Sequence, residues 1–340
     1  MTKSTTSETT SVRFGYAISS EEHAPADLVR NAARAEEAGV AFAMVSDHYH
    51  PWVDAQGHSP FVWTVLGAIA HATERLEVGT GVTCPMIRTH PAIIAQAAAT
   101  TADLFEGRFV LGVGTGENLN EHILGDHWPP YAERRDMLVE SIEIMRGLWE
   151  GELFSHRGEH YVVENARIYT LPDAPPPIVV AAAGPESGAA AGEHGDGLVV
   201  TAPQAEVLDA FRAAGGEGKP IYGQVTGCWA ASEDEGARTA HRIWPNAGLT
   251  GDLTQELPLP MHFEQATANV TPEMLAEKLP VGPSPEKWIQ GAREMIDAGV
   301  DHVYFHQIGP DQAGFFDFYT SELQPELEKL TSREPVGASR

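Results

Sequence analysis

The sequence predicts a closed (β/α)8 barrel, a TIM-like α/β fold with insertions. Eight apolar segments of strand length recur along the 340 residues, and helical segments separate most of them. The strand segments are apolar without interruption, which is typical of a parallel sheet covered on both faces. Eight repeats favour a closed barrel over an open, doubly wound sheet, which is the structural alternative. Barrels of this kind often exceed 250 residues as one domain.

The first half of the chain contains four regular strand–helix units. The predicted strands span 12–18, 42–48, 77–83 and 109–116, and the helices that follow them span 25–38, 60–75, 91–105 and 134–149. The last of these helices carries apolar residues three and four positions apart, the period of an amphipathic helix. Residues 153–169 then alternate like a β-hairpin, so we expect them to interrupt the repeat.

The second half continues the repeat around a long insertion. The predicted strands span 177–183, 197–201, 221–229 and 302–308, and later helices span 285–298 and 315–330. Residues 245–280 are rich in Pro, Thr and Gln, and we expect an irregular insertion there. The polar ends, 1–11 and 331–340, are predicted to be a disordered lead-in and a loose tail. The barrel would then be one domain over residues 12–330.

The composition narrows the possible partners and the compartment. With 48 Asp and Glu against 22 Lys and Arg, the net charge is −26, and such a surface repels nucleic acid and anionic membranes. No apolar run reaches the roughly 18 residues of a membrane span, and no secretory leader is recognisable. Two distant cysteines predict a reducing, cytoplasmic location. The acidic composition resembles that of proteins from salt-loving organisms.

Chemistry in such a barrel lies at the carboxyl ends of the strands, and polar residues gather there. His48 ends the second strand, and an imidazole can accept or return a proton near neutral pH. Glu117 follows a fourth strand whose end is rich in glycine, which lets a flat ring approach the backbone closely. For both residues a structural role, as a packed histidine and a helix-capping glutamate, is the alternative.

Other motifs are weaker or missing. The sequence has no dinucleotide fingerprint that opens a helix, no nucleophile elbow and no metal-ligand spacing among its 15 histidines. The run 184–187 meets the start of a helix after the fifth strand. It indicates either a phosphate held by backbone N–H groups or an ordinary helix start with proline in the first turn.

Three motifs in order resemble the luciferase-like monooxygenase superfamily, in its coenzyme F420-dependent branch. These motifs are Val45-Ser46-Asp47-His48 with Pro51-Trp52, then Gly79-Thr80-Gly81-Val82, then Gly112-Val113-Gly114-Thr115-Gly116-Glu117 with Asn120. The resemblance covers nearly the whole barrel. It implies an oxidoreductase that transfers a hydride between the deazaflavin coenzyme F420 and a small-molecule substrate, and a homodimer.

The resemblance also implies roles for individual residues. His48 is expected to be the acid/base toward a substrate hydroxyl, Glu117 to exchange a proton with the cofactor ring from its opposite end, and Trp52 and Glu21 to shape the hydride path. Gly81 and Val82 match a bulge with a non-proline cis peptide beneath the ring. The remaining positions implied to bind the cofactor are Asp47, Cys84, Thr115, Gly116, Asn120, Ala183, Gly184, Glu186 and Ser187.

The implied substrate pocket departs from the sugar-phosphate members of the branch. Thr201 is retained after the sixth strand, but Gln204 stands where those members have a lysine that grips phosphate. A phosphate needs cationic partners, so we expect an uncharged or differently charged alcohol or carbonyl substrate, and no metal. The alternatives are an F420-dependent sugar-6-phosphate dehydrogenase, an FMN-dependent monooxygenase of the same superfamily, and a binding protein without catalysis.

Overall fold

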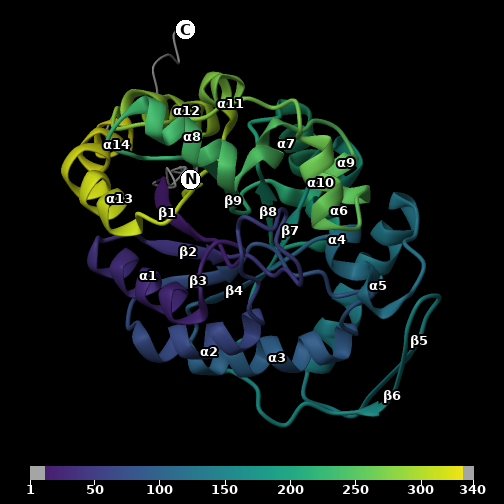
Figure 1. The fold of residues 1–340 in the computed structure, drawn as a ribbon. Helices are drawn as coiled ribbons and strands as arrows, with labels where there is room; N and C mark the ends of the chain where they lie inside the picture. Colours follow the sequence, from purple (N-terminus) through teal and green to yellow (C-terminus); the bar gives the residue numbers. More distant parts are fainter. Residues whose placement is uncertain (1–11, 332–340) are drawn as a thin grey trace, which may run out of the picture.

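The computed structural model describes residues 12–331 and confirms the predicted closed barrel (Figure 1). Its eight parallel strands close in the order β1-β10-β9-β8-β7-β4-β3-β2. The strands are β1 Arg13–Ile18, β2 Phe42–Val45, β3 Glu77–Thr80, β4 Phe109–Val113, β7 Ile178–Ala181, β8 Gly197–Val200, β9 Ile221–Gly227 and β10 His302–Gln307. The predicted lead-in, 1–11, and the tail from residue 332 lie outside the described residues.

Helices surround this barrel, as the predicted alternation requires (Figure 1). The helices are α1 Pro25–Glu37, α2 Val62–Ala72, α3 Pro91–Leu104, α4 Asn118–Glu121, α5 Tyr131–Trp149, α6 Pro185–His194, α7 Ala205–Phe211, α8 Glu233–Ile243, α9 Leu253–Glu256, α10 Pro260–Ala266, α11 Pro272–Lys278, α12 Glu286–Ala298, α13 Gln312–Phe318 and α14 Gln324–Thr331. The predicted hairpin is also confirmed: β5 Phe154–Arg157 pairs with β6 Val162–Ala166, and it projects beside α5.

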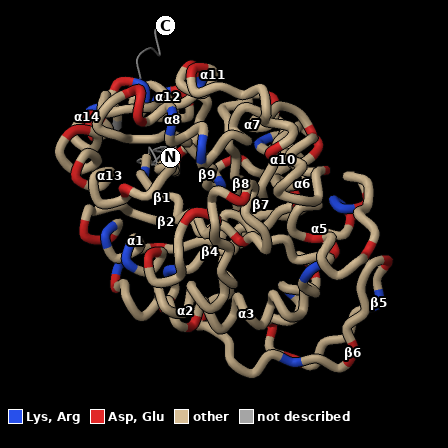
Figure 2. The backbone as a smooth tube through the Cα atoms, viewed as in Figure 1, with Lys and Arg blue, Asp and Glu red and all other residues tan. Residues whose placement is uncertain are grey.

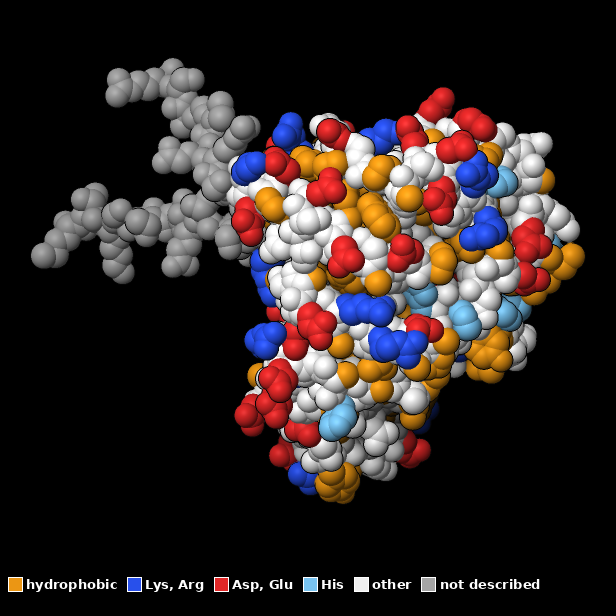
Figure 3. Space-filling view, turned by 60° about the vertical axis from the view of Figure 1, so that its left-hand side comes forward, with side chains coloured by type: hydrophobic (Ala, Val, Ile, Leu, Met, Phe, Trp, Pro, Cys, Tyr) orange, Lys and Arg blue, Asp and Glu red, His pale blue; other side chains and the backbone are white. Residues whose placement is uncertain are grey.

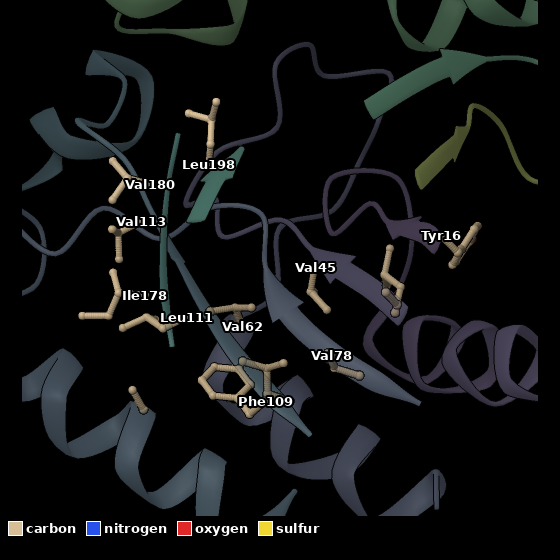
Figure 4. Close-up of a cluster of buried hydrophobic side chains, with 14 of the residues drawn as sticks. Tyr16, Val45, Val62, Val78, Phe109, Leu111, Val113, Ile178, Val180 and Leu198 are labelled. Carbon is tan, nitrogen blue, oxygen red and sulfur yellow. The ribbon is translucent and has the colours of Figure 1, made fainter. Parts of the chain in front are cut away.

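The strands bury both of their faces, which explains why they read as unbroken apolar runs. One face packs against the helices, and Figure 4 shows side chains such as Leu111, Val113 and Ile178 from neighbouring strands doing so. The other face fills the barrel interior with Ala17, Phe42, Met44, Val110, Val179, Val199, Tyr222 and Tyr304. Gly15 is required by this filling, because a Cβ there would lie 2.5 Å from the Phe42 ring.

Several strands end earlier than predicted. The second strand ends at Val45 rather than at 48, the third at Thr80 rather than at 83, and the fourth at Val113 rather than at 116. Beyond the ends of β3 and β4 the pairing continues only as an isolated bridge between Thr83 and Val113. Asp47, His48 and Glu117 lie on loops, where successive side chains need not alternate between two faces as they do along a strand.

The insertion is helical, and the expectation of an irregular segment over 245–280 is wrong. It contains a 3₁₀ turn, η3 Pro245–Gly248, followed by α9, α10 and α11. The local signals are those of short helices: Thr271 caps α11 through its side chain, and α10 and α11 begin with proline in the first turn. The insertion packs over the mouth of the barrel, where Phe263 of α10 joins Trp52, Val53 and Leu119 in one buried cluster.

Acidic side chains are spread over the outside of the molecule. Figure 2 shows Asp and Glu distributed around the ring of helices, with fewer Lys and Arg between them. Figure 3 shows the same mixture on one face, where apolar side chains are interspersed with both kinds of charge. Among residues 12–331, no helix is long and apolar enough to cross a membrane.

Candidate active site

His48 lies at the centre of a polar cluster at the mouth of the barrel. Its Nε2 lies 3.3 Å from Oε1 of Glu21, which follows β1, and 3.4 Å from Oε2 of Glu117, which follows β4. The Trp52 ring lies 5.1 Å from the imidazole, tilted by 55°. The structure thus brings together the four residues predicted to be catalytic. His48 and Glu117 are in contact with each other, and their expected reach to opposite ends of a ring stays a prediction.

Glu21 is buried as an anion. Its side chain is 2% exposed, and Oε2 accepts hydrogen bonds from the hydroxyls of Ser46 (2.7 Å) and Ser19 (2.9 Å). Burial alone would raise the pKa of this carboxyl, but the neighbouring His48 and these hydrogen bonds lower it below its ordinary value. Glu21 therefore stays ionised and faces the imidazole as a fixed negative charge.

The surroundings of His48 favour its protonated form. Burial would lower the pKa of the imidazole, but the carboxylates of Glu21 and Glu117 outweigh it and raise the pKa above its ordinary value. Nδ1 lies 3.2 Å from the carbonyl oxygen of His50 and 3.2 Å from Nδ2 of Asn120. One neighbour accepts and the other donates, so this nitrogen finds a partner with or without its proton.

Glu117 differs from Glu21 although both touch the same imidazole. Its side chain is 28% exposed at the mouth. Burial raises its pKa, and the negative charges of Glu21 and Glu121 add to this, while His48 and the Asn120 amide oppose it. Two carboxylates on one imidazole are thereby pushed toward different protonation states. Such a separation is typical of an acid/base site.

Asn120 ties the loops of this cluster together. Its Oδ1 accepts from the backbone N–H of Tyr49 (2.8 Å) and of His50 (3.2 Å), which orients the amide. Its Nδ2 then donates to Oε2 of Glu117 at 3.0 Å. Asn120 is buried, so its contacts position His48 and Glu117, and its predicted contact with a cofactor remains a prediction.

Asp47 belongs to a buried ionic network beneath the cluster. Its Oδ1 lies 3.1 Å from Nη2 of Arg88, and its Oδ2 accepts from the Thr83 hydroxyl at 2.8 Å. Arg88 also binds Glu121, whose Oε1 lies 3.3 Å from Nε of the guanidinium. Cys84 is buried beside this network, and burial raises the pKa of its thiol well above the ordinary value.

The sequence reasoning missed Arg88 and Glu121. A signal was present for Arg88, because it is the only charged residue between 78 and 102. A lone charge in so apolar a stretch requires a buried partner. Glu121 gave no comparable signal, because it lies among other polar residues of α4.

One wall of the mouth lies where β3, β4 and β7 end. The bond between Gly81 and Val82 is cis, as predicted. Val82 and Ala181 are half-buried and border Gly114, where a Cβ would lie 2.9 Å from Cγ2 of Val82. Thr115 and Gly116 continue along the same wall. Glycine has a positive φ of 73° at position 116, where a Cβ would strike Sγ of Cys84. Glycine is thus required at 114 and 116, because the neighbouring side chains pack too closely for a Cβ.

The start of α6 forms the far side of the same mouth. The Ser187 hydroxyl oxygen accepts from the N–H of Ala183 (3.2 Å) and of Gly184 (3.1 Å). A Cβ at Gly184 would meet nothing within 4 Å, so space lies open before the helix. Glu186 is exposed and lies 3.7 Å from Arg135 of α5. It lines a groove of about 630 Å³ outside the barrel, between α5, α6 and the hairpin.

Thr201 and Gln204 follow β8 and are both exposed. Within the described residues neither forms a hydrogen bond or ion pair with the His48 cluster, so their predicted contact with substrate stays a prediction. In residues 12–331 no group of three or more His, Cys, Asp and Glu side chains is arranged to hold a metal ion.

Comparisons with known proteins agree with this geometry. The model of the luciferase-like monooxygenase family matches residues 9–302. The chain is 36% identical to an F420-dependent glucose-6-phosphate dehydrogenase of Mycolicibacterium gilvum, covering 94% of this chain and 99% of the relative. It is 38% identical to an F420-dependent hydroxymycolic acid dehydrogenase of Mycobacterium tuberculosis, covering 95% and 90%.

A solved structure is also similar throughout. An F420-dependent secondary alcohol dehydrogenase, in complex with an F420-acetone adduct, superimposes with a TM-score of 0.86 at 27% identity, covering 93% of this chain and 99% of that one. A coenzyme F420-dependent tetrahydromethanopterin reductase from Methanopyrus kandleri shares the fold, with a TM-score of 0.74 at 20% identity.

Proposed function

The chain belongs to the luciferase-like monooxygenase family, and from that premise we propose that it transfers a hydride between coenzyme F420 and a small alcohol or carbonyl compound. The observation that carries the proposal is the imidazole of His48, held between Glu21 and Glu117 under Trp52. A hydride leaves an alcohol carbon only as the hydroxyl loses its proton, so such a reaction needs a base at this position.

The residues of the mouth fit a deazaflavin. Val82, Gly114 and Ala181 form a small, apolar wall suited to a flat ring, and the open start of α6 is suited to a phosphate. When bound, the deazaflavin supplies two-electron hydride chemistry. We assign the ring to Gly81, Val82, Thr115 and Gly116, and the phosphate-bearing part to Ala183, Gly184 and Ser187. Asp47, Cys84, Asn120 and Glu186 are assigned more distant contacts.

The chain's own residues manage one proton. In the oxidising direction the neutral imidazole of His48 accepts the proton of the substrate hydroxyl, and the anionic Glu21 stabilises the resulting imidazolium. Glu117 has a raised pKa, so its carboxyl can carry a proton at the exposed side of the cluster. Trp52 packs on the imidazole and excludes water from one of its faces. The reverse direction uses the same groups in the opposite protonation states.

The charges at the mouth favour an uncharged substrate. Glu21 and Glu117 are both acidic, and Arg88, the cation nearest to them, is engaged by Asp47 and Glu121. A sugar phosphate carries about two negative charges and needs free cationic partners. We therefore propose an alcohol or carbonyl compound without phosphate, with Thr201 and Gln204 near its outer end, although several relatives are named as glucose-6-phosphate dehydrogenases.

Two measurements test this function. Purified protein is titrated with F420 and with FMN while the fluorescence of each cofactor is followed. Reduction of F420 is then measured without oxygen, using 2-propanol and glucose 6-phosphate as separate substrates. We expect binding of F420 but not FMN, and reduction by the alcohol in preference to the phosphate. Binding of FMN alone would contradict the proposal and favour the monooxygenase. Selective oxidation of glucose 6-phosphate would overturn the proposed substrate class.

We also propose that the chain acts as a cytoplasmic homodimer. Support comes from the resemblance to a family whose members pair and from the two buried, unpaired cysteines, which suit a reducing compartment. Light scattering on the purified protein tests the dimer, and a monomeric mass at assay concentration would contradict it.

A further inference from the structure

A second buried histidine stands at the mouth, on β10. Nε2 of His306 lies 2.9 Å from Oε1 of Glu22, and each side chain is 2% exposed. The other carboxylate oxygen of Glu22 accepts from the N–H of Gly309 at 2.6 Å. A carboxylate accepts hydrogen bonds, so Nε2 carries a proton, and in the neutral ring Nδ1 presents a lone pair. Glu21 and Glu22, adjacent in sequence, thus each hold one histidine.

Both histidines border the same aromatic cluster. The Trp244 ring lies 4.5 Å from the His306 ring, nearly perpendicular to it. Trp244 also packs on the buried cluster that contains Trp52 and Phe263, and Trp52 contacts His48. The direction of His306 follows from the alternation along β10, where Tyr304, two residues earlier, fills the barrel interior. Nδ1 of His306 is buried without a hydrogen-bond partner among residues 12–331.

The neighbouring strand carries a hydroxyl at the same level of the barrel. Thr226 of β9 is the register partner of His306. It faces the barrel interior because Tyr222, four residues earlier on the same strand, does so. Thr226 is nevertheless only half-buried, so it is accessible from solvent. Its oxygen accepts from Nε2 of Gln224 at 2.9 Å, which leaves the hydroxyl proton free to donate.

We propose that Thr226 and His306 form a second polar subsite, built for a hydroxyl of the substrate. Nδ1 of His306 accepts the proton of that hydroxyl, and the Thr226 hydroxyl donates to its oxygen, so both capacities of an alcohol group are met. The aromatic rings of Trp52 and Trp244 pack against the carbon skeleton. The substrate is then an uncharged alcohol that carries a second hydroxyl in addition to the one that is oxidised. This inference rests on the proposed function.

The test compares two probe alcohols, 2-propanol and 1,2-propanediol, which differ by one hydroxyl. Reduction of F420 is measured with wild type, Thr226→Val and His306→Gln. We expect wild type to prefer the diol in kcat/KM. Each variant should lower kcat/KM about tenfold for the diol and change it little for 2-propanol. The reason is that the second hydroxyl of the diol loses a hydrogen-bond partner in each variant, whereas 2-propanol has no such hydroxyl. Thr226→Ser should restore the preference, and the exposed Thr64→Val is the matched control.

Other results decide against the subsite. If Thr226→Val and His306→Gln lower kcat/KM equally for both alcohols, or change it for neither, the subsite is overturned. His306→Gln can disturb the buried Glu22, but Thr226→Val replaces a side chain of similar shape and stands as an independent test. If wild type oxidises neither probe, crystals of the F420 complex soaked in 1,2-propanediol decide. A diol hydroxyl hydrogen-bonded to Nδ1 supports the subsite, and its absence there overturns it. Failure of the proposed function would be seen separately, because wild type would then not bind F420 in the titration.

Discussion

At the scale of single residues, one imidazole decides what this site can do. His48 lies between two carboxylates that differ in exposure and in pKa, so it can hold a proton in a fixed position and release it. Nδ1 has partners in both states, which spares the ring a change of orientation during proton transfer. The arrangement is that of a positioned general acid/base.

Replacing His48 separates proton transfer from cofactor binding. We expect His48→Gln to lower kcat for alcohol oxidation by about 10²- to 10⁴-fold, the usual contribution of a general base. The affinity for F420, measured by fluorescence titration, should change little. The matched control is His71→Gln, because His71 is exposed on α2. An equal loss of activity in both variants would remove His48 from the mechanism.

The pKa of His48 predicts the pH dependence of oxidation. Only the neutral imidazole accepts a proton, and the raised pKa keeps the ring protonated to higher pH than an ordinary histidine. The rise of kcat/KM with pH should therefore have its midpoint above 6.5. In Glu21→Gln one negative neighbour is removed, and the midpoint should move to lower pH. The control is Glu37→Gln, which should leave the midpoint unchanged because Glu37 is exposed. An unchanged midpoint in Glu21→Gln would contradict the prediction.

The sequence predicted the residues that meet in the candidate site better than the residues that position them. Glu21, His48, Trp52 and Glu117 meet as expected, because barrel topology alone brings the strand ends together. Their mutual geometry was not predictable, because loop conformation decides it, and His48 contacts Glu117 directly. Arg88 was missed for the same reason: the contacts that stabilise its charge come from loops far apart in sequence.

At the scale of elements, the insertion provides a wall of the site. Phe263 of α10 is fully buried and lies 5.1 Å from Trp52, edge to face. We expect Phe263→Ala to lower the free energy of unfolding by about 3–5 kcal/mol, the usual cost of removing a buried ring. Chemical denaturation followed by tryptophan fluorescence measures this. Met261→Ala on the same helix is the control, because Met261 is 50% exposed. Equal losses in the two variants would mean that α10 does not pack as described.

Arg88 joins the loops that follow β2, β3 and β4. Arg88→Met should lower the free energy of unfolding by about 3–5 kcal/mol, because Asp47 and Glu121 are then buried without a cation. Arg75→Met should cost less than about 1 kcal/mol, because Arg75 is 71% exposed and its contact with Glu36 is weak. Urea unfolding of both variants measures the difference, and similar values would contradict a buried network.

The elements show where sequence patterns stop being informative. Apolar runs predicted every barrel strand, because a strand buried on both faces leaves a plain pattern. The insertion lacks such runs, and its helices α9, α10 and α11 are too short for periodicity to reveal. Only proline and the Thr271 cap signalled them, and these also occur in loops.

At the scale of the whole molecule, charge dominates the surface. With a net charge of −26, the acidic side chains repel one another at low ionic strength and destabilise the folded state. The Debye length falls from about 30 Å at 0.01 M to about 3 Å at 1 M salt, so added KCl should screen the repulsion and raise Tm. Thermal unfolding across this range measures the effect. A constant or falling Tm would mean that the acidic surface does not limit stability.

Glu21 and Glu22 are consecutive residues, yet each serves a different imidazole. The single short loop after β1 therefore sets the place of both rings, and a shift of its backbone displaces both together. Variation in that loop cannot retune recognition of the alcohol without also disturbing its oxidation. A change of preferred substrate would have to arise on the opposing side, from Thr226 or from Trp244.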